Sequence, residues 1–184
     1  MHVDLILDSR LSAPEITELG LLAEKYGMQT IWVASYLDSR EPFVNLSQLA
    51  SQSSQINLGP VALNPFDTHP IRIAAGLLTL NELSSGRASI VIGSGGEALQ
   101  SLNLKTVKRV RAVRECIEIL KSISPSHSLN YNGEIFQVNN YHPFWATQSI
   151  PRVYVAANKP QMLKMSSRLS DGIMMSDLPA ALIK

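Results

Sequence analysis

The stretch RASIVIGSGGEAL, residues 87–99, joins an apolar run to a loop that contains three glycines. Residues 88–92 are typical of a strand buried on both faces, because Val and Ile favour a pleated, packed surface. The glycines lack the Cβ atoms that would keep a ligand away from the backbone N–H groups, and they allow φ > 0. Parallel α/β proteins bind ligands at the carboxyl ends of such strands. The stretch therefore predicts a cofactor-binding loop, with Glu97 at its edge.

Strand-like and helical segments alternate on both sides of this stretch. Short apolar runs predict strands at residues 3–7, 30–33, 57–63, 88–92, 152–156 and 172–176. Segments with the helical spacing of apolar residues separate most of them, which predicts repeated βαβ units and a parallel sheet. Six strands fit an open doubly wound sheet or an eight-stranded barrel that lacks two units, and a complete barrel has about 250 residues. We predict an incomplete (β/α)8 TIM-type barrel, with residues 1–184 forming one domain.

A hairpin is predicted between the fourth and fifth strands of that barrel. Asn132-Gly133 lies between strand-like residues, a pattern that predicts a two-residue turn. The helix before it has an apolar face and a basic face, and the basic face carries Lys105, Lys108, Arg109, Arg111 and Arg114. That basic face is either a solvated surface or a site for a ligand phosphate, and the sequence leaves both interpretations open.

The composition excludes several classes of function. Lys and Arg number 16 against 15 for Asp and Glu, so the net charge of +1 does not favour a nucleic-acid or acidic-membrane partner. A single cysteine, Cys116, forms no intrachain disulfide, and its apolar helix face predicts a packing role. The four histidines lack the spacing of metal ligands, so no metal site is predicted. With neither a signal peptide nor a membrane-spanning run in this sequence, we expect a soluble, cytoplasmic protein.

Several motifs, in order along the chain, resemble the bacterial-luciferase-like superfamily. They are GPVALNP at 59–65 followed by His69-Pro70, LSSGRA at 83–88, GSGGEAL at 93–99, YNGEIF at 131–136, IPRVYVAA at 150–157 and SDG at 170–172. This superfamily contains FMN-dependent monooxygenases and reductases or dehydrogenases that use the deazaflavin coenzyme F420. Its members fold as (β/α)8 barrels, so the resemblance also implies that the last third of the barrel is absent from this sequence.

The resemblance implies a set of site residues. A cis peptide bond at Val61-Ala62 is expected to lie against the central ring of the cofactor. Cofactor contacts are implied for Ser35, Val61, Ala62, Asn64, Gly95, Gly96 and Gln100, and phosphate contacts for the helix start at Asn158, Lys159, Gln161 and Met162. The two implied catalytic residues are Glu97, as acid or base, and Tyr36. Tyr36 stands where deazaflavin users have histidine, and a phenol of pKa ~10 is a weaker acid than an imidazole of pKa ~6.5.

Each of these residues also has a purely structural interpretation. Asn64 and His69 can organise their loop, while Glu97 and Lys159 can be solvated. The pattern G-x-G-x-x-A at 93–98 is not a nicotinamide fingerprint, because it follows the fourth strand and not the first.

The sequence thus predicts a flavin- or deazaflavin-dependent oxidoreductase, with F420 or FMN as cofactor. Its reaction would be hydride transfer to a small organic substrate, or monooxygenation of it. The alternative is a non-catalytic flavin-binding protein or a truncated barrel remnant. A homo-oligomer is expected, since unpaired strand edges invite association.

Overall fold

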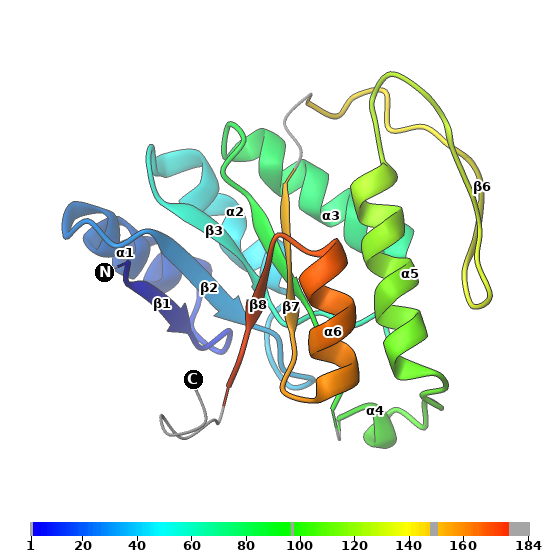
Figure 1. Ribbon diagram of the computed structural model, residues 1–184. Helices are drawn as coiled ribbons and strands as arrows, with labels where there is room; N and C mark the ends of the chain where they lie inside the picture. The colour runs from blue at the N-terminus through cyan, green and yellow to red at the C-terminus, as the bar shows by residue number, and fades with distance from the viewer. Residues whose placement is uncertain (1, 97, 148–150, 177–184) are drawn as a thin grey trace.

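The parallel strands and the helices alternate as the sequence predicts. The computed structural model describes residues 2–96, 98–147 and 151–176. The strands are β1 (Asp4–Leu7), β2 (Thr30–Ala34), β3 (Asn57–Val61), β4 (Ser89–Ile92), β5 (Leu129–Asn132), β6 (Gln137–Tyr141), β7 (Arg152–Ala156) and β8 (Gly172–Met174). The helices are α1 (Ala13–Lys25), α2 (Pro42–Gln52), α3 (Pro70–Leu83), α4 (Ala98–Ser101), α5 (Arg109–Ser122) and α6 (Pro160–Leu169). Figure 1 shows these elements in order along the chain.

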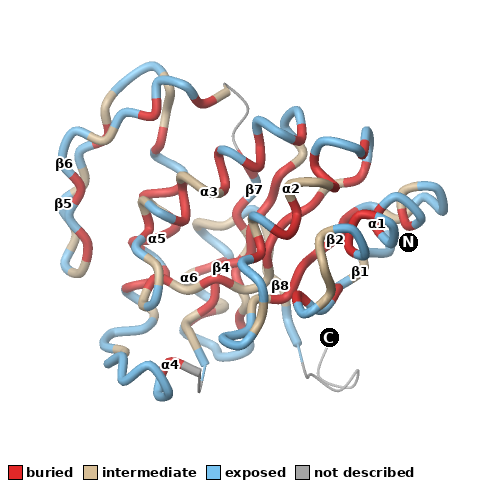
Figure 2. The backbone as a smooth tube through the Cα atoms, turned by 180° about the vertical axis from the view of Figure 1, so that it is seen from behind, coloured by how far each residue is buried: buried red, intermediate tan, exposed pale blue. Residues whose placement is uncertain are grey.

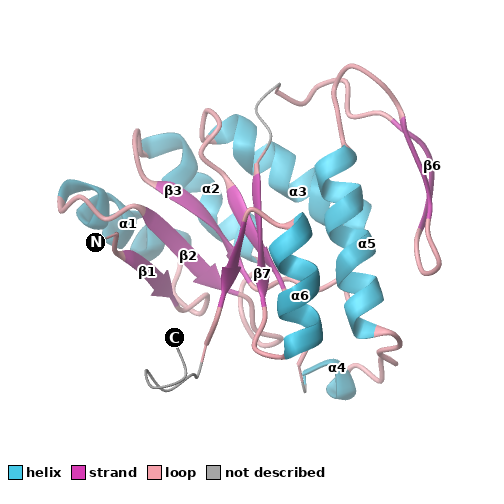
Figure 3. Ribbon diagram, in the orientation of Figure 1, coloured by secondary structure: helices cyan, strands magenta, loops and turns pink. Residues whose placement is uncertain are grey.

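The parallel strands follow the order β1-β2-β3 and β4-β7-β8, and β3 lies against β4. The two groups meet where Leu58 N–H donates to Arg87 O at 3.2 Å and Leu63 N–H donates to Val91 O at 3.0 Å. Between these bonds Pro60 has no N–H to donate, so the ladder is interrupted there. Figure 3 shows the long helices on the outer side of the curved strand layer. A doubly wound sheet carries helices on both faces, so this alternative is wrong.

Gly59 is required at the contact between β3 and β4. A Cβ atom on this residue would overlap the backbone carbonyl of Ser89. On the inner side of the sheet, Gly59 also lies beside the ring of Trp32. Trp32 makes an edge-to-face contact with Tyr154 of β7, with ring centroids 5.6 Å apart. These two aromatic rings fill the space inside the curve of the sheet.

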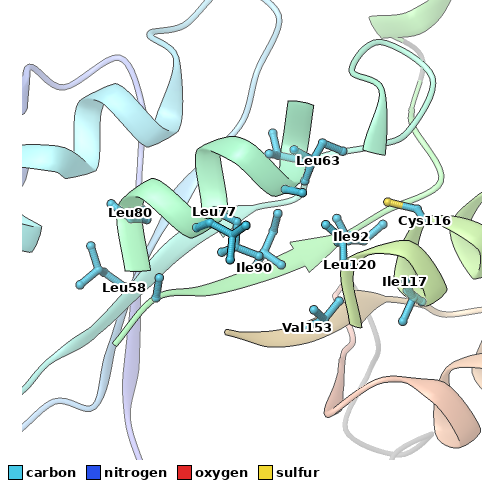
Figure 4. Close-up of a cluster of buried hydrophobic side chains, with 14 of the residues drawn as sticks. Leu58, Leu63, Leu77, Leu80, Ile90, Ile92, Cys116, Ile117, Leu120 and Val153 are labelled. Carbon is cyan, nitrogen blue, oxygen red and sulfur yellow. The ribbon is translucent and has the colours of Figure 1, made fainter. Parts of the chain in front are cut away.

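The main apolar core lies between the outer face of the sheet and the helices. Figure 4 shows side chains of β3, β4 and β7 meeting those of α3 and α5. Ile90 and Ile92 of β4 are fully buried there, and Cys116 is buried among them as predicted for a packing residue. Burial raises the pKa of the Cys116 thiol. Figure 2 shows that the buried backbone concentrates in the central strands and the inward faces of the helices.

Local sequence explains where the helices begin and end. Ser12 and Glu15 form a capping box at the start of α1, and Gly27 adopts a φ of +74° just after its end. His69 caps α3, whose first residue is the predicted Pro70. The guanidinium of Arg87 donates to the carbonyls of Ala50, Ser53 and Ile56, at 2.6–3.0 Å. Arg87 thereby provides hydrogen-bond donors for carbonyl groups at and beyond the end of α2, which have no partner within the helix.

The hairpin β5–β6 is present, but its turn does not lie at the predicted Asn132-Gly133. Asn132 pairs with Gln137 and Gly133 N–H donates to Phe136 O at 2.9 Å, so Glu134 and Ile135 form the tip. The carboxylate of Glu115 on α5 accepts the N–H groups of Glu134, Ile135 and Phe136 at 2.9, 2.9 and 3.0 Å. A Cβ atom at Gly133 would overlap Glu115 Oε2. The glycine therefore makes room for a buried carboxylate and does not supply the positive φ of a tight turn.

Candidate functional site

A cavity of about 630 Å³ lies at the carboxyl ends of β2, β3 and β4. We call it the β2–β4 cavity. Five of the implied cofactor contacts line it, together with the implied catalytic residue Tyr36; the five are Ser35, Ala62, Asn64, Gly95 and Gly96. They come from the loops after three neighbouring parallel strands, which is where a (β/α)8 barrel places its site.

The end of β3 forms one wall of the β2–β4 cavity. The Val61–Ala62 peptide bond is cis, as the resemblance implies. Ser35 N–H donates to Val61 O at 2.8 Å, which ties the loop after β2 to this bond. The opposite wall is the loop after β4, where Gly95 has a φ of +73° and a Cβ atom would overlap the side chain of Leu99. A Cβ on Gly96 would meet nothing within 4 Å, so its backbone is open to a ligand.

The side chain of Asn64 is engaged within its own loop. Its Oδ1 accepts the N–H groups of Phe66 and Asp67 at 3.0 and 3.2 Å, and its Nδ2 donates to Asp67 Oδ2 at 2.6 Å. This is the loop-organising role that the sequence left as the alternative. A cofactor contact by Asn64 stays a prediction.

Tyr36 lies at the mouth of the β2–β4 cavity and is 50% exposed. The guanidinium of Arg10, from the loop after β1, lies 5.0 Å from the centre of its ring. Arg10 also donates to both oxygens of Asp38 at 3.1 Å, and this contact lowers the pKa of the Asp38 carboxyl. The charges at this mouth are thus mixed in sign and partly paired.

A second cavity, of about 570 Å³, lies at the start of α6. We call it the α6 cavity. All four residues of the implied phosphate site line it: Asn158, Lys159, Gln161 and Met162. Ser94 and Arg109 also belong to its lining. The first helical N–H bonded within α6 is that of Leu163, to Lys159 O at 2.9 Å. Lys159 makes no side-chain cap, so the N–H groups of Gln161 and Met162 lie at the open end of the helix.

Asn158 has a structural partner in this second cavity. Its Nδ2 donates to Ser176 O at 2.7 Å and its Oδ1 accepts Ser176 N–H at 3.4 Å. The pair joins the loops after β7 and β8. The positively charged side chains in the described lining of the α6 cavity are Lys159 and Arg109, and they lie near the open N–H groups of α6. The sequence indicated Arg109 only as one member of a basic helix face, because its partner Lys159 is 50 positions away along the chain.

Two implied site residues, Val61 and Gln100, line neither cavity. Val61 contributes its carbonyl to the bond from Ser35 but lines neither cavity, and Gln100 is exposed on α4. Glu97, the implied acid or base, lies outside the described residues, so its role stays a prediction. His69 organises its loop: Nδ1 accepts Ile71 N–H at 3.2 Å, and its ring contacts Phe136 edge-to-face at 5.5 Å.

The described residues contain no group of three or more His, Cys, Asp or Glu side chains arranged to hold a metal ion. Over the same residues, no helix combines the length and apolar character needed to cross a membrane.

Comparison with known proteins gives consistent matches. The family model described as luciferase-like monooxygenase matches residues 2–184. A 5,10-methylenetetrahydromethanopterin reductase of Archaeoglobus fulgidus is 31% identical over 156 residues, which is 84% of this chain and 47% of that protein. An F420-dependent glucose-6-phosphate dehydrogenase of Kineococcus radiotolerans is 26% identical over 172 residues, 86% of this chain and 51% of the relative.

Solved structures share the fold. The coenzyme F420 dependent tetrahydromethanopterin reductase of Methanopyrus kandleri superposes with a TM-score of 0.81 at 22% identity, covering 95% of this chain and 55% of that one. The chain thus spans about half the length of these proteins, and its fold is an incomplete (β/α)8 barrel, as predicted. Because the family model covers nearly every residue, the chain belongs to the luciferase-like monooxygenase family.

Proposed function

We propose that this chain binds the tricyclic ring of coenzyme F420 or FMN in the β2–β4 cavity and the cofactor phosphate in the α6 cavity. One observation carries the proposal: a single glycine-rich loop separates the two cavities. Ser94 lines the α6 cavity, while Gly95 and Gly96 line the β2–β4 cavity. A ligand with a flat ring at one end and a phosphate at the other would cross this loop at Ser94, Gly95 and Gly96, which are all small.

The residues present fit both parts of such a cofactor. The β2–β4 cavity offers open backbone at Gly96 and the surface of Ala62, which suit the face and edge of a planar ring. The α6 cavity offers two helix N–H groups and the cations Lys159 and Arg109, which suit a phosphate. Relatives whose names include F420 support this choice, and a structural neighbour of 18% identity and TM-score 0.72 was solved with FMN.

The proposed activity is an oxidoreduction of a small organic substrate. When bound, a flavin or deazaflavin supplies the hydride chemistry, and a reduced flavin also activates oxygen. The part of this chain is to hold the ring against the end of β3, to anchor the phosphate and to shield one face of the ring from water. To Tyr36, which lines this cavity, we assign the exchange of a proton with the bound molecule.

The first experiment is a binding titration that separates ring from phosphate. Absorbance and fluorescence of FMN and of F420 are followed with the chain, beside riboflavin and the phosphate-free deazaflavin, which keep the rings alone. Lys159→Gln should weaken binding of the phosphate-bearing forms about three- to tenfold and leave the phosphate-free forms unchanged. Lys25→Gln, an exposed cation on α1, is the matched control and should change neither. If none of the four compounds binds, the proposal is wrong.

The second experiment tests turnover. The names of the relatives provide the first substrates to try with the loaded chain: methylenetetrahydromethanopterin and glucose 6-phosphate. A change in the cofactor absorbance that depends on substrate supports an oxidoreductase. Saturable cofactor binding with no redox change for any substrate or reductant would instead support the non-catalytic alternative.

A further inference from the structure

A groove runs along the outside of the barrel between α5 and α6. It has a volume of about 390 Å³, and its lining residues are Val110, Arg114, Gln161, Lys164, Met165, Arg168 and Leu169. Val110 and Gln161 also line the α6 cavity. The groove therefore begins at the proposed phosphate site and leads away from it between the two helices, which lie side by side in Figure 1.

Every charged residue in the described lining of the groove and of the α6 cavity is basic. Arg109 and Lys159 line the cavity, Arg114, Lys164 and Arg168 line the groove, and no Asp or Glu lines either. The chain as a whole carries a net charge of only +1. The β2–β4 cavity, by contrast, is lined by charges of both signs, among them Asp38, Glu41 and Arg40. The path from the phosphate site to the groove is therefore lined by five basic residues, and its described lining contains no carboxylate.

Two of the groove cations have no acidic partner within the described chain. Arg114 pairs with Glu118 at 2.7 Å, but no carboxylate among residues 2–96, 98–147 and 151–176 lies within 4.0 Å of the charged groups of Lys164 or Arg168. Gln161, Lys164 and Arg168 follow one face of α6, with the spacing of successive helical turns. At about 1.5 Å per residue, the path from Lys159 to Arg168 is about 13 Å long.

We propose that this groove holds an anionic chain that continues from the phosphate of the bound cofactor. The inference rests on the proposed function, because the α6 cavity must hold that phosphate first. FMN ends at its phosphate, whereas the phosphate of F420 continues into a lactate and a tail of linked glutamates, each with a carboxylate. Lys164 and Arg168 contact the tail carboxylates, and the groove thereby favours the tailed deazaflavin over any cofactor that ends at the phosphate.

The test compares cofactors that share one ring and differ only in the tail. The dissociation constant of the intact chain is measured by fluorescence for F420 with several glutamates and for the form with lactate but no glutamate. We expect the tailed form to bind about three- to tenfold more tightly in low salt, from two exposed charge contacts. This ratio should approach one in about 1 M salt, where the screening length is about 3 Å.

Variants locate the effect in the groove. Lys164→Gln and Arg168→Gln should each reduce the preference for the tail and leave the binding of the glutamate-free form unchanged. Lys25→Gln, which removes one exposed charge from α1, should leave the preference intact. Equal affinity of the wild-type chain for both forms would overturn the inference while the proposed function stands. Failure of both forms to bind would overturn the proposed function and this inference with it.

Discussion

The carboxylate of Glu115 is expected to hold the β5–β6 hairpin on α5, and Glu115→Gln tests this role. The side chain is 1% exposed and accepts three backbone N–H groups of the hairpin loop. Glutamine has nearly the same shape, so the substitution changes hydrogen bonding and charge but leaves packing in place. It replaces one of two accepting oxygens by a group that donates.

The size of the effect follows from which oxygen is replaced. Oε1 accepts Glu134 N–H, and Oε2 accepts Ile135 and Phe136 N–H. The amide must lose at least the bond to Glu134, and its NH₂ group then points at that N–H. A lost bond to a charged acceptor costs about 1.5–3 kcal/mol. We therefore expect the free energy of unfolding to fall by about 2–3 kcal/mol.

Urea denaturation followed by circular dichroism measures the loss, and amide hydrogen exchange locates it. Exchange at Glu134, Ile135 and Phe136 should accelerate more than exchange in α1. Glu18→Gln, an exposed charge removal on α1, is the control and should change the free energy of unfolding by less than about 0.5 kcal/mol. If Glu115→Gln were no more destabilising than this control, the carboxylate would not anchor the hairpin and the reasoning would be refuted.

Two further predictions concern β3 and the loop that follows it. Gly59→Ala should lower the free energy of unfolding by about 3 kcal/mol or more, because the new Cβ overlaps the Ser89 carbonyl. Gly27→Ala, with a φ of +74° but open space, should cost only about 1–2 kcal/mol in the same urea titration. Stability should also fall as the pH drops below about 6.5, because burial lowers the pKa of His69 and the unfolded chain then binds the proton more readily. His69→Asn, which accepts the Ile71 N–H at every pH, should flatten this dependence, and an unchanged profile would contradict the assignment.

Periodicity explains why the order of the elements was predictable. A strand buried on both faces and an amphipathic helix differ in the period of their apolar residues, and these periods are local. Pro70 and Gly27 mark a helix start and a helix end for equally local reasons of backbone geometry. The interruption of the ladder at Pro60 is also local, since the residue itself lacks the donor.

The structural roles that the sequence did not reveal depend on partners that are distant in sequence. The sequence suggests that Gly133 is a turn glycine. In the structure a larger residue would collide with the carboxylate of Glu115, which lies 18 positions earlier in the chain. The implied phosphate ligand Asn158 is bonded to the backbone of Ser176. No local pattern distinguishes such tertiary roles from cofactor contacts, because the residue type suits both. The resemblance predicts the region of the site, and the structure adds the hydrogen bonds that its residues make within the chain.

The two cavities differ in charge, and that difference fixes how a cofactor can lie. The described lining of the β2–β4 cavity carries three carboxylates, from Asp38, Glu41 and Asp67, and one cation, Arg40, so it offers little net attraction to an anion. The α6 cavity presents cations and helix N–H groups with no carboxylate in its described lining. Our proposal therefore directs the anionic end of a cofactor towards α6 and its ring towards the apolar and backbone surfaces beside Ala62 and Gly96. The glycine loop after β4 allows this orientation, but the placement of charge on α5 and α6 selects it.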